Sequence, residues 1–227
     1  MNQRTPDDPI RVTFFGDSIC VGQGVSIYRG WVTRIARDLD ELSQMIGRET
    51  LVTNASVNGR TTRQALEDMP YSVQSAGVDL LIVQFGLNDC NYWASDKGVP
   101  RVSGPAFAAN LAEIMARGCT FGAKKIFLNT NHPTIRGKDI LPGTSITYEN
   151  SNAEYNCIIR NLAKKAGSEV VFHDIEAIFN KRVQNGIDLA TLLLKDGLHL
   201  STAGHEIYYE TMAPAVIRAV QEFAGNH

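Results

Sequence analysis

The run IRVTFF at residues 10–15, which continues into Gly16-Asp17-Ser18-Ile19, decides the fold that this sequence predicts. The run is short, apolar and rich in β-branched and aromatic side chains, which favours a strand. It stops at a glycine and passes into a polar turn. A helical spacing of apolar side chains follows, at Trp31, Ile35, Leu39 and Leu42.

The same alternation of strand and helix patterns continues along the chain. Further strands are expected at residues 50–55, 79–85, 125–129 and 169–173, and helices at 30–45, 61–75, 105–117, 150–166 and 203–223, the last capped by Ser201. The strands are apolar throughout rather than alternating, as in parallel sheets covered on both faces. The sequence therefore predicts one α/β domain over residues 1–227, a doubly wound three-layer α/β/α sandwich, with residues 1–9 as a flexible N-terminal extension.

Composition excludes several classes of function. The 227 residues are 44% hydrophobic and carry 22 basic and 24 acidic side chains, a net charge of −2. This balance lacks the surplus of basic residues that is typical of nucleic-acid-binding proteins. The N-terminus lacks the apolar core of a secretory signal, and no window reaches the ~18 apolar residues of a membrane span. The four cysteines form no C-x-x-C pair, so we expect reduced thiols and a cytoplasmic protein.

Four polar clusters follow or adjoin the predicted elements, where sites in parallel sheets lie. They are Gly16 to Ile19, Asn54 to Gly59, Gly86-Leu87-Asn88-Asp89 and Asp196-Gly197-Leu198-His199. The spacing of the last cluster allows Asp196 to orient the imidazole of His199 as a general base. A base of this kind would activate the hydroxyl of Ser18, which is otherwise a weak nucleophile.

The same clusters contain donors for a developing oxyanion. These are the backbone N–H groups of Ser18 and Gly59 and the side-chain amide of Asn88. Asp17 and Asp89 are expected to brace their turns. A G-x-S-x-G nucleophile elbow is absent from the sequence.

Taken together, the four clusters resemble the sequence blocks of the SGNH hydrolases, also called the GDSL esterase/lipase family. Gly16, Asp17 and Ser18 match the first block, Gly59 the second, Gly86, Asn88 and Asp89 the third, and Asp196 and His199 the last. Ile19 replaces the usual Leu. The resemblance spans residues 10 to about 215.

The resemblance implies a flavodoxin-like five-stranded sheet of order 2-1-3-4-5 and ester hydrolysis through a seryl intermediate. It makes Ser18 the nucleophile, His199 the base and Asp196 its orienter. Gly59 and Asn88, with the Ser18 N–H, become the oxyanion donors. Neither a cofactor nor a metal is expected.

The substrate has to be judged from two long irregular loops, 87–104 and 130–149. Candidate substrate contacts there are Asn91, Tyr92, Trp93 and His132. Because the loops are polar with isolated aromatics, we expect short acyl esters such as O-acetyl groups on sugars. Lysophospholipid or thioester hydrolysis and acyl transfer on the same triad remain open.

Each feature also has a plainer interpretation. Ser18 alone could be a turn residue, His132 a solvated loop side chain, and Cys20 and Cys90 packing residues. Asp196, His199 and His205 could together bind a metal, but the sequence offers no second cluster of ligands to complete such a site. A non-catalytic module of the same fold would be expected to have lost one of the reacting groups. A nucleotide-binding flavodoxin-like protein would need a richer phosphate loop than Gly22-Gln23-Gly24.

Overall fold

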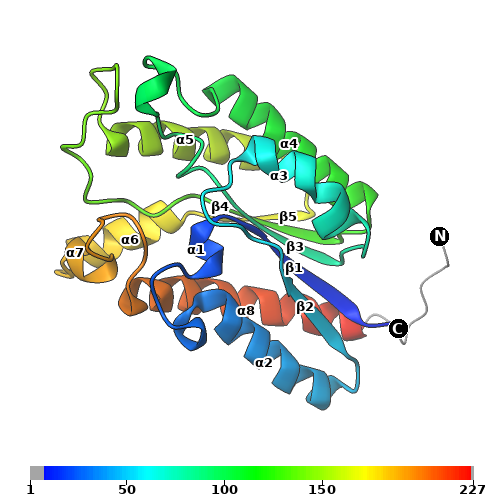
Figure 1. Ribbon diagram of the computed structural model, residues 1–227. Helices are drawn as coiled ribbons and strands as arrows, with labels where there is room; N and C mark the ends of the chain where they lie inside the picture. Colours follow the sequence, from blue (N-terminus) through cyan, green and yellow to red (C-terminus); the bar gives the residue numbers. More distant parts are fainter. Residues whose placement is uncertain (1–7, 226–227) are drawn as a thin grey trace.

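The computed structural model of the protein describes residues 8–225 and contains one five-stranded sheet (Figure 1). The strands are β1 Ile10–Gly16, β2 Thr50–Asn54, β3 Leu80–Gln84, β4 Lys125–Asn129 and β5 Val170–His173. Every neighbouring pair is parallel and the order is β2-β1-β3-β4-β5, which confirms the predicted topology. Most of the predicted N-terminal extension, residues 1–7, lies outside the described residues. The single-domain organisation of the whole chain stays a prediction.

Helices cover both faces of this sheet. In Figure 1, α3 (Thr62–Met69), α4 (Gly104–Thr120) and α5 (Tyr148–Ala163) lie on one face, and α2 (Trp31–Ile46) and α8 (Thr202–Gly225) on the other. The central strand β3 is buried at every position, whereas the edge strands β2 and β5 are partly exposed. The three-layer sandwich follows from this burial, because an apolar strand has to be covered on both sides.

Three helices were not predicted. They are α1 (Ser18–Val21), α6 (Ile175–Gln184) and α7 (Leu189–Leu192), and each begins after an aspartate whose side chain accepts a backbone N–H. Aspartate is a preferred N-cap, so the signal was present in the sequence, although α1 and α7 are too short to show a periodicity. The helix predicted at 61–75 is α3 followed by a π-helical turn, Pro70–Gln74.

The core beneath the site is aromatic. Trp31 at the start of α2 is fully buried, and its ring meets Phe14 of β1 edge-on at 5.3 Å between centroids. Its indole N–H donates to the carbonyl oxygen of Ile19 at 2.9 Å. Trp31 therefore fixes the short helix α1 to the sheet.

Candidate active site

Ser18 is the first residue of α1, directly beyond the carboxyl end of β1. The side chain of Asp17 caps this helix by accepting the N–H of Ile19 at 2.9 Å. Gly16 makes the sharp exit possible, because an added Cβ would lie 2.6 Å from Cys20 Sγ and 2.7 Å from the Gln84 carbonyl oxygen. The turn thus fixes where Ser18 can point.

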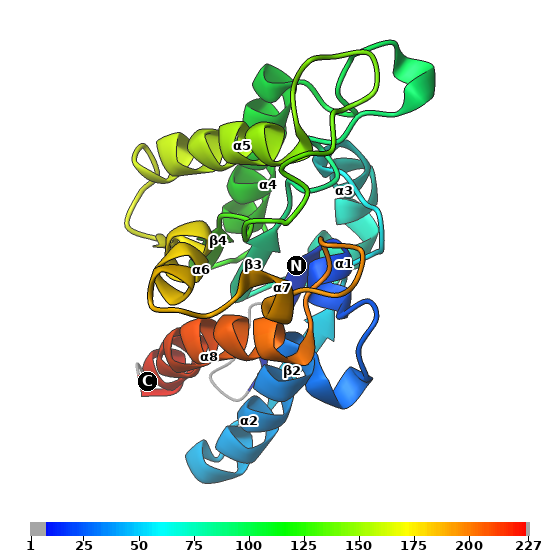
Figure 2. The ribbon, with the colours of Figure 1, turned by 90° about the vertical axis from the view of Figure 1, so that its left-hand side faces the viewer.

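Asp196 and His199 lie in the segment between α7 and α8. An antiparallel bridge between Leu193 and Leu200 closes this segment into a tight loop, in which Gly197 has a positive φ of 69°. In Figure 2 this segment lies beside α1, at the edge of the sheet where the strands end. The loop therefore carries both side chains to Ser18.

The three side chains form a continuous hydrogen-bonded chain. His199 Nδ1 lies 2.6 Å from Asp196 Oδ2, and His199 Nε2 lies 2.9 Å from Ser18 Oγ. Burial opposes ionisation of Asp196, but hydrogen bonds from the His199 ring and from the N–H groups of Leu198 and His199 outweigh it and lower the pKa of this carboxyl. An ionised Asp196 holds the proton on Nδ1, which leaves Nε2 free to accept from the hydroxyl.

The second cluster lies against the first. The N–H of Val57 donates to the Gly16 carbonyl oxygen at 3.2 Å, which brings the loop of Gly59 beside Ser18. Gly59 has a φ of 75°, which disfavours any other residue. Among residues 8–225, the N–H groups of Ser18 and Gly59 have no backbone or side-chain acceptor. Both donors are free to bind a ligand oxygen.

Asn88 approaches from β3. Its Nδ2 donates to Asp17 Oδ2 at 3.2 Å, which ties the third cluster to the first. Asp89 turns inward and accepts both the N–H and the hydroxyl of Thr62 at the start of α3, at 2.9 and 2.6 Å. As expected, Asp89 braces the loop that holds Asn88.

Two carboxyl groups beneath the site are deeply buried. Burial raises the pKa of Asp17 to about 7 and that of Asp89 to about 6. Hydrogen bonds from Ile19 and Asn88 to Asp17, and from Thr62 to Asp89, act in the opposite direction without cancelling the desolvation.

The expected substrate contact through His132 is wrong. The ring is fully buried, with Nε2 2.8 Å from the Leu198 carbonyl oxygen and Nδ1 3.0 Å from the Tyr208 hydroxyl. No ring nitrogen is left for a substrate. Burial also lowers the pKa of His132 to about 4, so the ring is neutral and supports the backbone beside His199.

The other candidate substrate residues lie together on the loop after β3. Asn91 uses its side-chain oxygen to accept the N–H of Tyr92 at 2.9 Å, and Tyr92 is partly buried against the core. Trp93 is 53% exposed. The Arg101 guanidinium carbon lies 4.4 Å from the centroid of the Trp93 ring. Sequence reasoning missed Arg101, because no spacing pattern marks a lone cation in a polar loop.

The cysteines near the site are packing residues. Cys20 and Cys90 are buried, and desolvation raises the pKa of both thiols. A protonated thiol is a poor nucleophile. Within the described part of the chain, no group of three His, Cys, Asp or Glu side chains has the arrangement of a metal site. None of the described helices combines the length and apolar character needed to cross a membrane.

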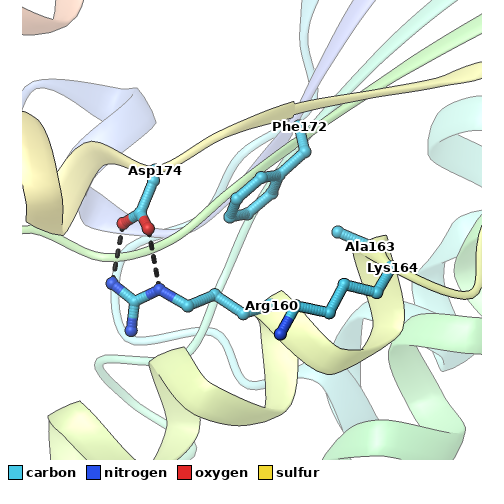
Figure 3. A pocket seen from close by; sticks show the side chains of 5 residues that line it. All are labelled: Arg160, Ala163, Lys164, Phe172 and Asp174. Carbon is cyan, nitrogen blue, oxygen red and sulfur yellow. Dashed lines mark hydrogen bonds and ion pairs between the residues drawn. The ribbon is translucent and has the colours of Figure 1, made fainter.

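A pocket elsewhere on the molecule is lined by residues of α5 and by Phe172 and Asp174 at β5 (Figure 3). Its charged groups pair with each other: Arg160 Nε and Nη2 each lie 2.7 Å from an oxygen of Asp174. Arg160 Nη2 also donates to Glu176 at 2.5 Å. None of the predicted site residues lines this pocket.

The fold agrees with comparisons to known proteins. Residues 14–207 match the GDSL-like lipase/acylhydrolase family. The chain therefore belongs to this family of hydrolases, which confirms the resemblance seen in the sequence.

Individual relatives are more distant. Esterase TesA of Pseudomonas aeruginosa is 27% identical over 134 residues, 59% of this chain and 60% of TesA. The chain thus spans about three fifths of the length of the curated relative it matches.

Solved structures share the fold along nearly the whole chain. The lipase/acylhydrolase from Enterococcus faecalis superposes with a TM-score of 0.70 at 21% identity, covering 92% of this chain and 96% of that one. Axe2, an acetylxylan esterase from Geobacillus stearothermophilus, gives 0.69 at 21% identity, with 98% of both chains covered.

Proposed function

We propose that this protein is a serine ester hydrolase that cleaves short acyl esters through an acyl-enzyme. The observation that carries the proposal is the hydrogen-bonded chain from Ser18 Oγ through the His199 ring to Asp196. Membership of a lipase/acylhydrolase family supports the same reaction class.

In this reaction the Ser18 oxygen attacks the ester carbonyl carbon while its proton passes to His199 Nε2. The imidazolium is stabilised by the ionised Asp196 across the 2.6 Å contact. The tetrahedral intermediate collapses when His199 returns this proton to the departing alcohol oxygen, which leaves Ser18 acylated. Water then attacks the acyl-enzyme with His199 again as the base, and the acid leaves as the proton returns to Ser18.

Three donors are available for the negative oxygen of the tetrahedral intermediate. They are the N–H groups of Ser18 and Gly59 and the second N–H of the Asn88 amide, which has no acceptor among residues 8–225. These groups are fixed before the substrate arrives, so they do not have to reorganise as charge develops.

For the substrate we propose an acetyl or similarly short acyl group on a sugar or small metabolite. The polar loop that carries Asn91, Tyr92 and Trp93 offers one exposed aromatic rather than a wide apolar surface. Acetylxylan esterases are among the proteins that share the fold. Turnover of p-nitrophenyl acetate well above that of the octanoate, with acetate released from acetylated xylo-oligosaccharides, would support this substrate class. A preference for long acyl chains would contradict it.

We also propose a reducing compartment such as the cytoplasm. All four cysteines are free thiols, and Cys119 and Cys157 are exposed.

The reaction class is tested by treating the protein with a fluorophosphonate probe, which phosphonylates an activated serine and releases fluoride. We expect a single adduct on Ser18 and the loss of p-nitrophenyl acetate turnover in Ser18→Ala. The matched control is Ser75→Ala, an exposed serine whose hydroxyl donates only to the Tyr71 carbonyl oxygen at 2.6 Å. An adduct on another residue, or full activity in Ser18→Ala, would contradict the proposal.

A further inference from the structure

Arg101 contacts two of the groups proposed to bind the oxyanion, although it belongs to none of the four clusters. Its Nη1 donates to Asn88 Oδ1 at 3.3 Å, and its Nη2 donates to the Gly59 carbonyl oxygen at 3.0 Å. Asn88 and Gly59 precede Arg101 in the sequence by 13 and 42 positions. One guanidinium therefore links the loop after β2 to the loop after β3.

The contact with Asn88 decides which way its amide faces. With Oδ1 held by the guanidinium, the NH₂ group is directed to Asp17, where Nδ2 lies 3.2 Å from Oδ2. If the amide were flipped, its NH₂ group would face the N–H donors of Arg101 and its oxygen would face the Asp17 carboxylate. Both contacts would be repulsive. Without Arg101, only the contact with Asp17 would select the amide orientation. That selection is weaker, because burial raises the Asp17 pKa to about 7, and a protonated carboxyl can either accept from the NH₂ group or donate to the amide oxygen.

The contact with Gly59 adds a restraint to a turn that is otherwise held by backbone hydrogen bonds, among them the Arg60 N–H donating to the Val57 carbonyl oxygen at 3.2 Å. Gly59 has a φ of 75° and an added Cβ would meet nothing within 4 Å, so packing does not fix this residue. Glycine also has the widest range of accessible backbone angles. Anchoring the Gly59 carbonyl oxygen to the guanidinium further limits the rotation of the loop, and with it the direction of the Gly59 N–H.

Arg101 is itself held in place. Its backbone N–H donates to the Asn91 carbonyl oxygen at 2.9 Å, and the next residue, Val102, donates to the Asp89 carbonyl oxygen at 3.2 Å. The guanidinium lies over the Trp93 ring at 4.4 Å. Such a stacked position retains the charge while restricting the rotation of the long side chain.

We infer that Arg101 is a positioning residue of the oxyanion hole, whose planar fork fixes the Asn88 amide and the Gly59 loop together. The inference rests on the proposed function, because it assigns Arg101 a role in that reaction. The role of the planar fork can be distinguished from that of the positive charge. A lysine retains the charge, but its one ammonium nitrogen cannot occupy the two separate positions of Nη1 and Nη2.

The test compares Arg101→Lys and Arg101→Met with the wild-type protein in p-nitrophenyl acetate hydrolysis. Misplacing a donor by about 1 Å can cost on the order of 10²-fold in rate, so we expect each variant to lose about 10- to 100-fold in kcat. The KM should change by less than about twofold, because the oxyanion exists only after attack. Wild-type kcat in Arg101→Lys, or a loss confined to KM, would overturn the inference.

A double-mutant cycle provides the second measurement. If Arg101 acts through Asn88, Arg101→Met should lower kcat several-fold less in an Asn88→Ala background than in the wild-type protein. An equal fold-loss in both backgrounds would overturn this route of action.

The controls separate positioning from folding and from the proposed function. Arg117→Met removes a guanidinium on α4 that pairs only with Glu113, and it should leave kcat unchanged. Thermal unfolding checks that each variant folds. If Arg101→Met does not fold, the kcat of Arg101→Lys tests the inference by itself. Wild-type kcat in both Arg101 variants, with Ser18→Ala inactive, would overturn the inference alone. Activity retained in Ser18→Ala would instead overturn the proposed function.

Discussion

Asp196 holds His199 through both of its carboxylate oxygens. Oδ1 accepts the backbone N–H of His199 at 3.0 Å, and Oδ2 lies 2.6 Å from the ring Nδ1. The same Oδ1 also accepts the N–H of Leu198 at 3.0 Å. One side chain therefore shapes the loop and fixes the imidazole, and these two roles can be separated by substitution.

Asp196→Asn should retain the shape of the loop and lose the reaction. The amide oxygen can still accept the two backbone N–H groups, but the NH₂ group now faces the ring and favours the tautomer with the proton on Nε2. We expect kcat for p-nitrophenyl acetate to fall by about 10²–10⁴-fold. The melting temperature should lie closer to the wild-type value than that of Asp196→Ala, which loses every one of these contacts. An Asp196→Asn variant with wild-type kcat would show that Asp196 does not orient the base.

Asn88→Ala should lower kcat by about 10²–10³-fold, which is typical for the loss of one oxyanion donor. The KM should change little, because the ester oxygen gains its full charge only near the transition state. Steady-state kinetics over a range of ester concentrations make this comparison. Asn185→Ala is the control, since Asn185 is exposed and lies at the C-terminal end of α6. A loss confined to KM would assign Asn88 to ground-state binding instead.

His132→Gln should change how stability depends on pH. The pKa of His132 falls to about 4 in the folded protein, against about 6.5 in an unfolded chain. The unfolded state therefore binds more protons between these values, so this histidine stabilises the fold above about pH 6.5. That contribution is lost as the pH falls through 4, at up to about 1.4 kcal/mol per pH unit.

Glutamine can donate to the Leu198 carbonyl oxygen and accept from Tyr208 without titrating. As the pH falls from 6.5 to 4, the unfolding free energy of the wild-type protein should therefore decrease relative to that of His132→Gln. Denaturant unfolding at several pH values measures this difference. Taking a difference cancels the contribution of Asp17, whose raised pKa gives the opposite slope. A difference that stays constant with pH would contradict the prediction.

Gly16→Ala should destabilise the protein by about 1–3 kcal/mol, as overpacking a close contact does. The new Cβ would lie 2.6 Å from Cys20 Sγ and 2.7 Å from the Gln84 carbonyl oxygen. Because the exit from β1 sets the direction of Ser18, esterase activity should fall as well. Gly137→Ala is the matched control, since its Cβ would meet nothing within 4 Å. Equal unfolding midpoints for the two variants would show that the turn at Gly16 can relax.

Local patterns in the sequence determined most of the fold. Apolar runs and helical spacing predicted the five strands and five of the helices, and the strand at 125–129 has the predicted bounds. The family resemblance added the strand order. Asp196 and His199 were recognisable because a three-residue spacing in a tight turn brings two side chains together within one loop.

The tertiary structure decided the surroundings of the loop side chains. His132 is buried because Tyr208 and Leu198, 76 and 66 positions away, close over it, and nothing near residue 132 in the sequence records this. Arg101 meets Gly59 and Asn88 only because β2, β1 and β3 end at one edge of the sheet. The periodicity of a sequence reflects which side of a helix or strand is buried. A loop has no such period, so its contacts depend on distant elements that come together only in the folded chain.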